Sequence, residues 1–324
     1  MNEKFSRRSF LKRMAATGAL VATSQLPSLA EDNPSVFPER GRYERLALGY
    51  VTVNIGLEKP FSVLHISDTH LTAAYPYENE KKQKLTAGRT KTFGGRQEEA
   101  LHDSLAWAKE HVDYVVHTGD LIDWQSEANF DLVKKYFGSA IVGTMGNHEF
   151  SPDMGYSEPK ETHTEAFKAL SRDKLQQVYP FNVTFQSQVI NGVNFITLDD
   201  VYGYVTKDQV AMFKEEAKRG LPMVLCMHVP FYTDDIWRAD QRYWQSKPSH
   251  FTEAAVPEIK GEYKLQQTDP VTSGFIAYLK KEPLLKAILT GHMHITIQDQ
   301  FSPTAREYVI GGNFMFHGEE VLFI

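Results

Sequence analysis

The stretch FSVLHISDTH, residues 61–70, decides the fold of this chain. Its first part is mostly apolar, as expected of a buried strand, and it ends in the polar triplet Asp68-Thr69-His70. The same arrangement, an apolar run followed at once by polar residues, recurs in four later segments: DYVVHTGD (113–120), AIVGTMGNHEF (140–150), PMVLCMH (222–228) and KAILTGHMH (286–294). Because the site of an open α/β sheet lies at the carboxyl ends of its strands, we expect these five ends to meet.

Helical patterns separate the predicted strands. The sequence predicts helices over residues 95–111, 127–137, 161–170, 207–218 and 273–281. Asn191-Gly192 between two further apolar segments, 181–190 and 193–199, predicts a tight hairpin. An irregular insert follows over 233–269, and three short strands are expected to close the chain. This alternation is typical of an α/β domain, and no interdomain linker interrupts it, so we expect a single domain over residues 31–324.

The first 30 residues are expected to be an export signal. They have a basic start, an apolar middle and a small-residue ending, Ser28-Leu29-Ala30. The segment from Ser6 to Lys12, SRRSFLK, resembles the twin-arginine signal of bacteria, which implies the twin-arginine export machinery as a partner and a periplasmic or secreted location. An uncleaved membrane anchor is the alternative, but residues 14–30 are too polar and too few to span a bilayer. The processed chain is therefore not expected to be an integral membrane protein.

Composition limits the class of partner. The 324 residues are 42% hydrophobic and 23% charged, which is ordinary for a globular protein. Removing residues 1–30 leaves 30 basic and 40 acidic side chains, a net charge of −10. Polynucleotide-binding proteins usually carry a basic surface, so we expect no polynucleotide partner and favour a small substrate. Cys226 is the only cysteine, so no internal disulfide can form.

The five strand-end motifs gain their meaning in combination. Each alone is expected in an ordinary turn or loop, and a lone HxH pair such as His292-Met293-His294 is usually not a metal site. Together and in this order they resemble the calcineurin-like metallophosphoesterase family, over about residues 60–300. The resemblance implies an α/β fold of four layers, αββα, in which two mixed β-sheets flanked by helices pack face to face. It also implies two divalent metal ions.

The residues that would hold these ions offer only nitrogen and oxygen atoms, which suits manganese, iron or zinc. The resemblance implies that one ion is held by Asp68, His70, Asp120 and His294. It implies that the other is held by Asp120, Asn147, His228 and His292, with Asp120 as the bridge. Two divalent ions, two aspartates and a bridging hydroxide would leave the centre with one positive charge. That charge favours an anionic phosphate.

The implied chemistry is hydrolysis of a phosphomonoester or phosphodiester by metal-activated water or hydroxide. His148 is expected to face the substrate and protonate the leaving oxygen, because imidazole titrates near neutrality. Asp123 and Glu149 are expected to orient imidazoles, with ordinary surface carboxylates as the alternative. A binding or scaffold protein with structural metals remains the second hypothesis. A nuclease is the third, and the acidic balance disfavours it.

Two inserts beside the motifs are candidates for substrate selection. Residues 72–97 form a long polar stretch in which Arg89, Lys91, Arg96, Tyr75 and Tyr77 could grip a phosphate or stack on a base; a solvated loop is the alternative. The insert 233–269 holds aromatic residues that suit either a lid or packing against the exterior: Trp237, Tyr243, Trp244, Phe251 and Tyr263. Purple acid phosphatases place a tyrosine where this chain has Asp123, so an iron centre of their kind is not expected. Only thirty residues follow His294, so we expect no second domain like that of exported nucleotidases.

Overall fold

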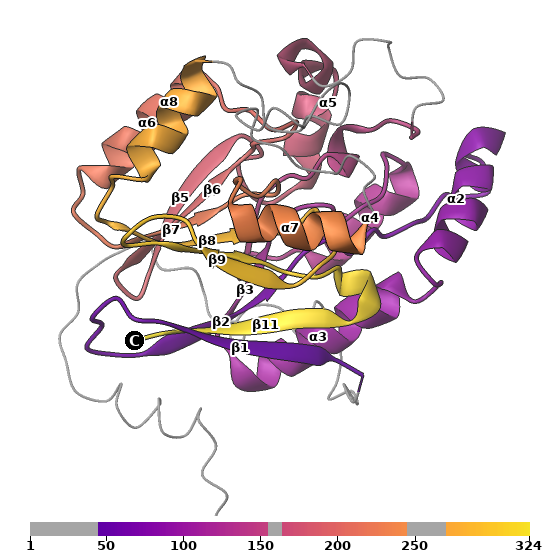
Figure 1. Ribbon diagram of the computed structural model, residues 1–324. Helices are drawn as coiled ribbons and strands as arrows, with labels where there is room; N and C mark the ends of the chain where they lie inside the picture. Colours follow the sequence, from indigo (N-terminus) through magenta and orange to yellow (C-terminus); the bar gives the residue numbers. More distant parts are fainter. Residues whose placement is uncertain (1–44, 155–163, 245–269) are drawn as a thin grey trace, which may run out of the picture.

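The computed structural model describes residues 45–154, 164–244 and 270–324 (Figure 1). The predicted export signal therefore lies outside the described residues. So do residues 161–163 of one predicted helix and residues 245–269 of the second insert.

The first β-sheet carries the first three motifs. Its five strands lie in the order β1-β11-β2-β3-β4. Their bounds are Ala47–Val53 (β1), His317–Phe323 (β11), Phe61–Ile66 (β2), Tyr114–His117 (β3) and Ile141–Gly143 (β4). Strands β2, β3 and β4 are parallel, whereas β11 is antiparallel to β2 and parallel to β1. The parallel arrangement brings the ends of β2, β3 and β4 to one edge, where their motifs begin.

The second β-sheet carries the other two motifs. Its six strands lie in the order β5-β6-β7-β8-β10-β9. Their bounds are Phe185–Ile190 (β5), Val193–Leu198 (β6), Met223–Cys226 (β7), Leu285–Thr290 (β8), Arg306–Val309 (β10) and Ile297–Gln300 (β9). Strands β6, β7, β8 and β10 are parallel, and β5 and β9 run antiparallel at the two edges. Asn191 and Gly192 join β5 to β6 with φ of 49° and 84°, as the predicted hairpin turn requires.

The two sheets pack face to face through an apolar core. Phe195 of β6 lies 6.3 Å from Phe61 of β2 and 5.5 Å from Phe323 of β11 between ring centroids. These rings share one buried cluster with Val63, Val116, Val224 and Leu289 from both sheets. Each such side chain stabilises the fold by roughly 1.5–3 kcal/mol when fully buried.

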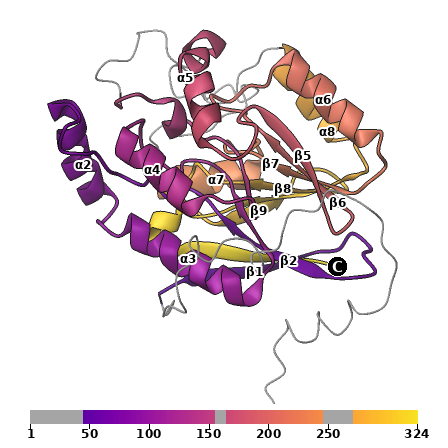
Figure 2. The same cartoon turned by 180° about the vertical axis from the view of Figure 1, so that it is seen from behind.

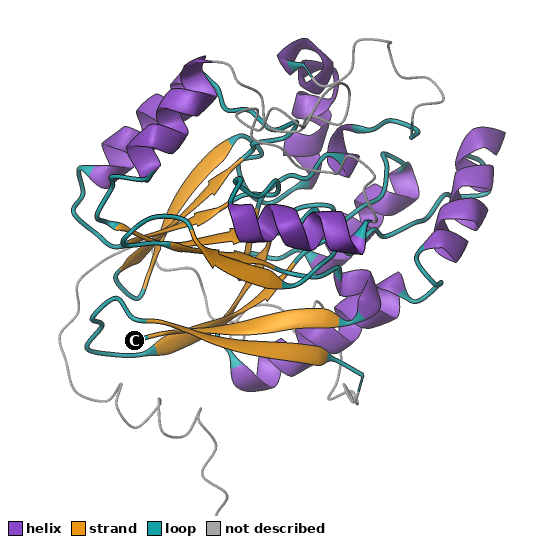
Figure 3. Cartoon of the chain, in the orientation of Figure 1, coloured by secondary structure: helices purple, strands orange, loops and turns teal. Residues whose placement is uncertain are grey.

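Helices cover the outer face of each sheet (Figure 3). The helices α3 (Gln97–His111), α4 (Glu127–Tyr136) and α5 (Glu165–Val178) pack apolar residues in one cluster with those of β2 and β3. The helices α6 (Lys207–Ala217) and α8 (Pro270–Leu279) pack against β6, β7 and β8. The four-layer αββα sandwich of two mixed sheets is thus confirmed, as are the three short closing strands β9, β10 and β11.

The helix predicted over residues 161–170 continues to Val178 as α5. Three further elements depart from the sequence-based expectations. Strand β1 was not expected, and the polar stretch 72–97 contains a helix, α2 (Glu80–Thr92), that stands at the margin of the molecule (Figure 2). The insert after β7 begins with a helix, α7 (Asp234–Tyr243), rather than irregular chain. Its Thr233 side chain caps the first turn by accepting a hydrogen bond from the backbone of Ile236.

Candidate metal centre

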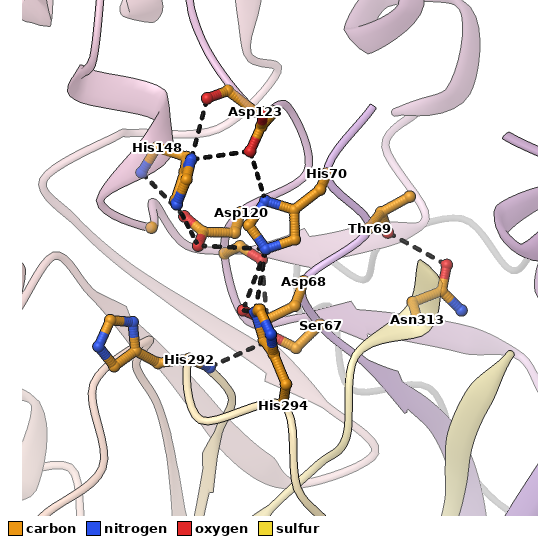
Figure 4. Close-up of polar contacts among 12 residues, drawn as sticks. Ser67, Asp68, Thr69, His70, Asp120, Asp123, His148, His292, His294 and Asn313 are labelled. Atoms are coloured by element: carbon orange, nitrogen blue, oxygen red, sulfur yellow. Dashed lines mark hydrogen bonds and ion pairs between the residues drawn. The ribbon is translucent and has the colours of Figure 1, made fainter. Parts of the chain in front are cut away.

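The predicted metal ligands lie together where the two sheets present their strand ends. Figure 4 labels five of them: Asp68, His70, Asp120, His292 and His294. Asp68 and His70 follow β2, Asp120 follows β3 and Asn147 follows β4; all three strands belong to the first sheet. His228 follows β7, and His292 and His294 follow β8, in the second sheet. The centre therefore joins the two halves of the sandwich.

The backbone at these residues is strained. Eight non-glycine residues in the described part of the chain have positive φ, and five of them are candidate ligands: Asp68, His70, Asp120, His292 and His294. Positive φ is sparsely populated by residues with a Cβ atom, and such strain concentrates at functional sites. The loops are thus held in conformations that aim side chains at a common point instead of relaxing.

Close packing of the loops explains the glycines in the motifs. A Cβ atom on Gly291 would lie 1.9 Å from Ser67 Oγ and 2.5 Å from Asp68 Oδ2. A Cβ atom on Gly146 would lie 2.1 Å from Asp120 Oδ1. Glycine therefore follows strand β8 because the neighbouring ligand loop occupies the space that a side chain would need.

The first cluster of donors contains Asp68, His70 and His294. His294 Nε2 lies 3.1 Å from His70 Nε2 and 3.3 Å from Asp68 Oδ1. Asp120 Oδ2 lies 3.7 Å from His70 Nε2. These are the four residues that the resemblance assigns to one ion.

The second cluster contains Asp120, His228 and His292. His228 Nε2 lies 3.3 Å from Asp120 Oδ2, 3.2 Å from Asn147 Oδ1 and 3.1 Å from His292 Nδ1. Because Oδ2 of Asp120 lies near His70 as well as His228, one oxygen atom faces both clusters. Its other oxygen, Oδ1, accepts a hydrogen bond from the backbone N–H of His148 at 2.9 Å.

The candidate ligand atoms suit a cation because they are lone-pair atoms that face one another with no proton between them. His70 Nδ1 lies 2.9 Å from Asp123 Oδ1, and His228 Nδ1 lies 2.7 Å from the carbonyl oxygen of Thr118. Each Nδ1 therefore carries the proton in the neutral ring, and each Nε2 points a lone pair at carboxylate oxygens. Asp68 Oδ1 is buried and has no hydrogen-bond partner. Such an arrangement is repulsive unless positive charge lies between the atoms.

The titration behaviour of the site indicates the same demand for positive charge. Burial alone would lower the pKa of His228, yet the Asp120 carboxylate raises it to about 10. Burial would raise the pKa of Asp120, but the imidazoles of His228 and His148 hold it well below its ordinary value. Positive charge on the imidazoles beside Asp120 thus stabilises its buried carboxylate, and metal ions would supply such charge instead.

His148 and Asp123 form a polar network beside the clusters. His148 Nδ1 lies 2.9 Å from both the backbone oxygen and Oδ1 of Asp123, which leaves Nε2 of the ring on the pocket side. The same Oδ1 contacts His70, and Arg89 binds Asp123 with two donors. Burial would lower the pKa of His148, but the carboxylates of Asp120 and Asp123 raise it to about 9.

Glu149 has a different role from the one expected. Its carboxylate accepts hydrogen bonds from the backbone N–H groups of Asp120, Leu121 and Gly146 and from the Tyr179 hydroxyl, rather than contacting an imidazole. It therefore shapes the loop that carries Asp120.

A pocket of about 410 Å³ opens onto the centre. Its lining residues other than the predicted ligands and His148 are Arg89, Thr92, Phe93, Met154, Tyr243, Trp244, Phe314 and Met315. Both inserts, residues 72–97 and 233–269, contribute side chains to the lining of this pocket. Tyr75 and Tyr77 turn elsewhere and donate hydrogen bonds to Asp131 and Glu127 of α4.

Asn313 was not predicted to belong to the site, and it lies in the short helix η3 (Asn313–Met315). Its backbone N–H donates to the Ser67 oxygen at 2.7 Å, and its side-chain oxygen accepts from Thr69 Oγ1 at 3.1 Å (Figure 4). It fastens the Asp68 loop from a distant part of the chain. The signal in the sequence was the apolar run YVI (308–310) at the end of β10, which is followed by Gly311-Gly312-Asn313.

No helix among the described residues is both long and apolar enough to cross a membrane.

Solved structures resemble this chain only at low similarity. A dimetal phosphatase from Danio rerio is 14% identical, with a TM-score of 0.41 over 79% of this chain and 88% of that one. A 5′-nucleotidase from Candida albicans is 12% identical, with a TM-score of 0.37 over 86% of this chain and 47% of that one. An anchor protein of the Plasmodium inner membrane complex is 11% identical, with a TM-score of 0.38 over 78% of this chain and 72% of that one. These scores decide nothing about activity.

Sequence comparison gives the stronger result. No curated protein matches the chain significantly. The model of the calcineurin-like phosphoesterase family matches residues 61–296, a span that includes all five strand-end motifs. This chain therefore belongs to the calcineurin-like phosphoesterase family.

Proposed function

We propose that the chain is a dinuclear metal-dependent phosphoesterase that hydrolyses phosphomonoester or phosphodiester bonds. The observation that carries the proposal is the pair of nitrogen and oxygen clusters that share Asp120 and lie beside His148 in one pocket. Membership of the phosphoesterase family supports it.

The predicted ligands retain their proposed assignment. Asp68, His70, Asp120 and His294 would hold one divalent ion, and Asp120, Asn147, His228 and His292 the other. When bound, two such ions supply Lewis acidity that neutralises phosphoryl charge and makes water a nucleophile. Manganese, iron and zinc all suit this donor set, and metal analysis of the native protein would distinguish them.

His148 would handle the proton of the leaving group. As the oxygen of water joins phosphorus, the bond between phosphorus and the ester oxygen breaks, and that oxygen takes a proton from His148 Nε2. Asp123 holds the opposite ring nitrogen, so it fixes the orientation of the ring and favours its protonated form. The two residues are therefore our candidates for the catalytic acid and its partner.

Substitution of His148 tests the activity. We expect His148→Ala to keep its metal content and to lose about 10²- to 10⁴-fold in kcat/KM, because proton transfer is removed without a ligand. His102→Ala is the matched control, since the His102 side chain is 42% exposed and lies in α3. Full activity of His148→Ala would refute the acid role. A metal-loaded native protein that cleaves no member of a monoester and diester panel would favour the binding or scaffold alternative.

We also propose export through the twin-arginine machinery to the periplasm or beyond, as the segment SRRSFLK suggests. Replacing both arginines, Arg7→Lys with Arg8→Lys, should leave the precursor in the cytoplasm of a bacterial host. Unchanged export of that double variant would rule out this route.

A further inference from the structure

Arg89 is the only lysine or arginine that lines the pocket within the described residues. It lies in the last turn of α2, and its side chain is 26% exposed. The helix α2 is otherwise polar, and Leu85 is its only buried residue. Of the 13 residues of this helix, Arg89 and Thr92 are the two that reach the pocket.

The guanidinium of Arg89 is fixed in position. Its Nε and Nη2 donate to Asp123 Oδ2 and Oδ1 at 2.5 and 2.8 Å. Its central carbon lies 4.8 Å from the centroid of the Phe93 ring, which in turn stacks on His70 at 4.3 Å and 11°. A cation that is already ordered loses little conformational freedom when it binds a ligand.

One nitrogen of the group has unused donors. A guanidinium offers five N–H groups, and Asp123 takes those of Nε and one of Nη2. No hydrogen bond of Nη1 to any described residue is recorded, and the side chain borders the same pocket as His148 and Asp120. The fork of a guanidinium matches the oxygen atoms of phosphate groups as well as those of carboxylates.

We propose that Arg89 is a specificity-determining residue that donates from Nη1 to a phosphoryl oxygen and makes the pocket selective for phosphomonoesters over phosphodiesters. This inference rests on the proposed phosphoesterase function. A monoester carries about two negative charges near neutral pH, because its second pKa is about 6, whereas a diester carries one. An additional fixed cation beyond the metal ligands therefore favours the monoester.

A purely positioning role is the competing explanation, because Arg89 also holds Asp123. In that role, loss of Arg89 would disturb His70 and His148 through Asp123 and slow every substrate by a similar factor. A direct phosphate contact instead weakens the binding of the dianion more than that of the monoanion. The two roles therefore differ in the ratio of two activities.

The chain provides a matched control for the experiment. Arg96 also binds one carboxylate with two nitrogens: its Nε and Nη2 donate to Glu99 Oε2 and Oε1 at 2.7 and 2.8 Å. Its central carbon lies 4.6 Å from the centroid of the Phe316 ring. It does not line the pocket. Arg96→Met thus removes the same interactions at a site without the proposed function.

Two substrates with the same leaving group supply the measurement: 4-nitrophenyl phosphate and methyl 4-nitrophenyl phosphate. We expect the native protein to prefer the monoester. We expect Arg89→Met to lower kcat/KM for the monoester at least about tenfold more than for the diester, mainly through KM. Arg89→Lys keeps the positive charge without the planar guanidinium group, so its kcat/KM for the monoester should fall less than that of Arg89→Met. Arg96→Met should leave the ratio of the two kcat/KM values unchanged.

Binding of inorganic phosphate, measured by calorimetry on metal-loaded protein, gives a second readout that needs no turnover. Affinity should fall at least about tenfold in Arg89→Met and stay unchanged in Arg96→Met. Equal losses for both substrates with unchanged phosphate affinity in the folded, metal-loaded variants would overturn the proposal and leave a positioning role. Lack of all hydrolysis by the native protein would instead count against the phosphoesterase function, while phosphate affinity would still decide the role of Arg89.

Discussion

Asp120 shows how much of the centre depends on single atoms. Its Oδ1 accepts a hydrogen bond from the backbone N–H of His148, and its Oδ2 faces both clusters, at 3.3 Å from His228 Nε2 and 3.7 Å from His70 Nε2. Asp68 divides its oxygens in the same way, since Oδ2 accepts from the backbone of His292 and Oδ1 faces the first cluster. Backbone donors thus fix the orientation of both carboxylates.

Asn147 tests the charge of the centre. We expect Asn147→Asp to raise KM about tenfold or more while metal content stays near that of the native protein, because the added negative charge cancels the single positive charge expected with two ions bound. Kinetics and metal analysis on the same preparation check this. An unchanged KM with full metal loading would show that the charge balance does not govern binding.

Gly291 tests the close approach of the two sheets. A Cβ atom there would lie 1.9 Å from Ser67 Oγ, so Gly291→Ala should displace the Asp68 loop, lower metal content and cost about 2 kcal/mol or more in the free energy of unfolding. Gly274→Ala in α8 is the control, because nothing lies within 4 Å of its added Cβ, and it should be neutral or slightly stabilising. Metal content and denaturant unfolding of both variants would decide. Normal metal binding by Gly291→Ala would contradict the packing argument.

Among the elements, β11 contains a buried carboxyl group, that of Glu319, which lowers the free energy of unfolding at high pH. Burial raises the pKa of Glu319 in this central strand from 4.5 to about 7. The Glu319 carboxyl group therefore binds its proton more tightly in the folded state than in the unfolded state. The stability that this protonation contributes is complete below about pH 4.5 and is lost as pH rises through 7. We expect Glu319→Gln to exceed the native protein in unfolding free energy by up to about 3 kcal/mol at pH 8, and by far less at pH 4.5.

Denaturant unfolding at the two pH values measures that difference. Glu80→Gln is a suitable control, because the Glu80 side chain is 93% exposed. A difference between Glu319→Gln and the native protein that does not change with pH would show that the Glu319 carboxyl group is not the cause.

The predictability of the elements follows from where their apolar residues lie. Strands such as β2 and β7 are buried on both faces, so their sequences are largely apolar, with Ser62 and His65 the polar residues of β2. The helix α2 buries only Leu85 and has no apolar face, so it gave no periodic signal; Asn79, which caps it by accepting from Lys82, was the one available clue. Strand β1 lies at a sheet edge and is half exposed, which weakens its pattern as well.

The site followed the same logic. Residues that end buried strands, from Asp68 to His294, could be predicted because each motif sits beside a strong local pattern. Arg89 was included only as one of several basic residues in an insert, and Asn313 was missed, since the approach of α2 and η3 to the Asp68 loop depends on tertiary packing. Spacing along the chain does not encode such contacts.

At the scale of the whole molecule, the predicted ligands link the two sheets. Removing the ions would leave buried carboxylates and imidazole lone pairs facing one another, so chelation should lower the unfolding temperature as well as abolish activity. At an ion concentration about 1,000 times the dissociation constant, binding at one site contributes about 4 kcal/mol. Thermal unfolding before and after dialysis against a chelator, and after metal is returned, measures this. An unfolding temperature that stays the same after complete removal of the metal ions would contradict the proposal that the ions link the two sheets.

The central claim is that two ions share Asp120, and anomalous diffraction from crystals of the protein loaded with manganese tests it most directly. We predict two anomalous peaks about 3.5–4 Å apart, with Asp120 between them and the other six predicted ligands divided three and three. A single peak, or two peaks that do not share Asp120, would contradict the account.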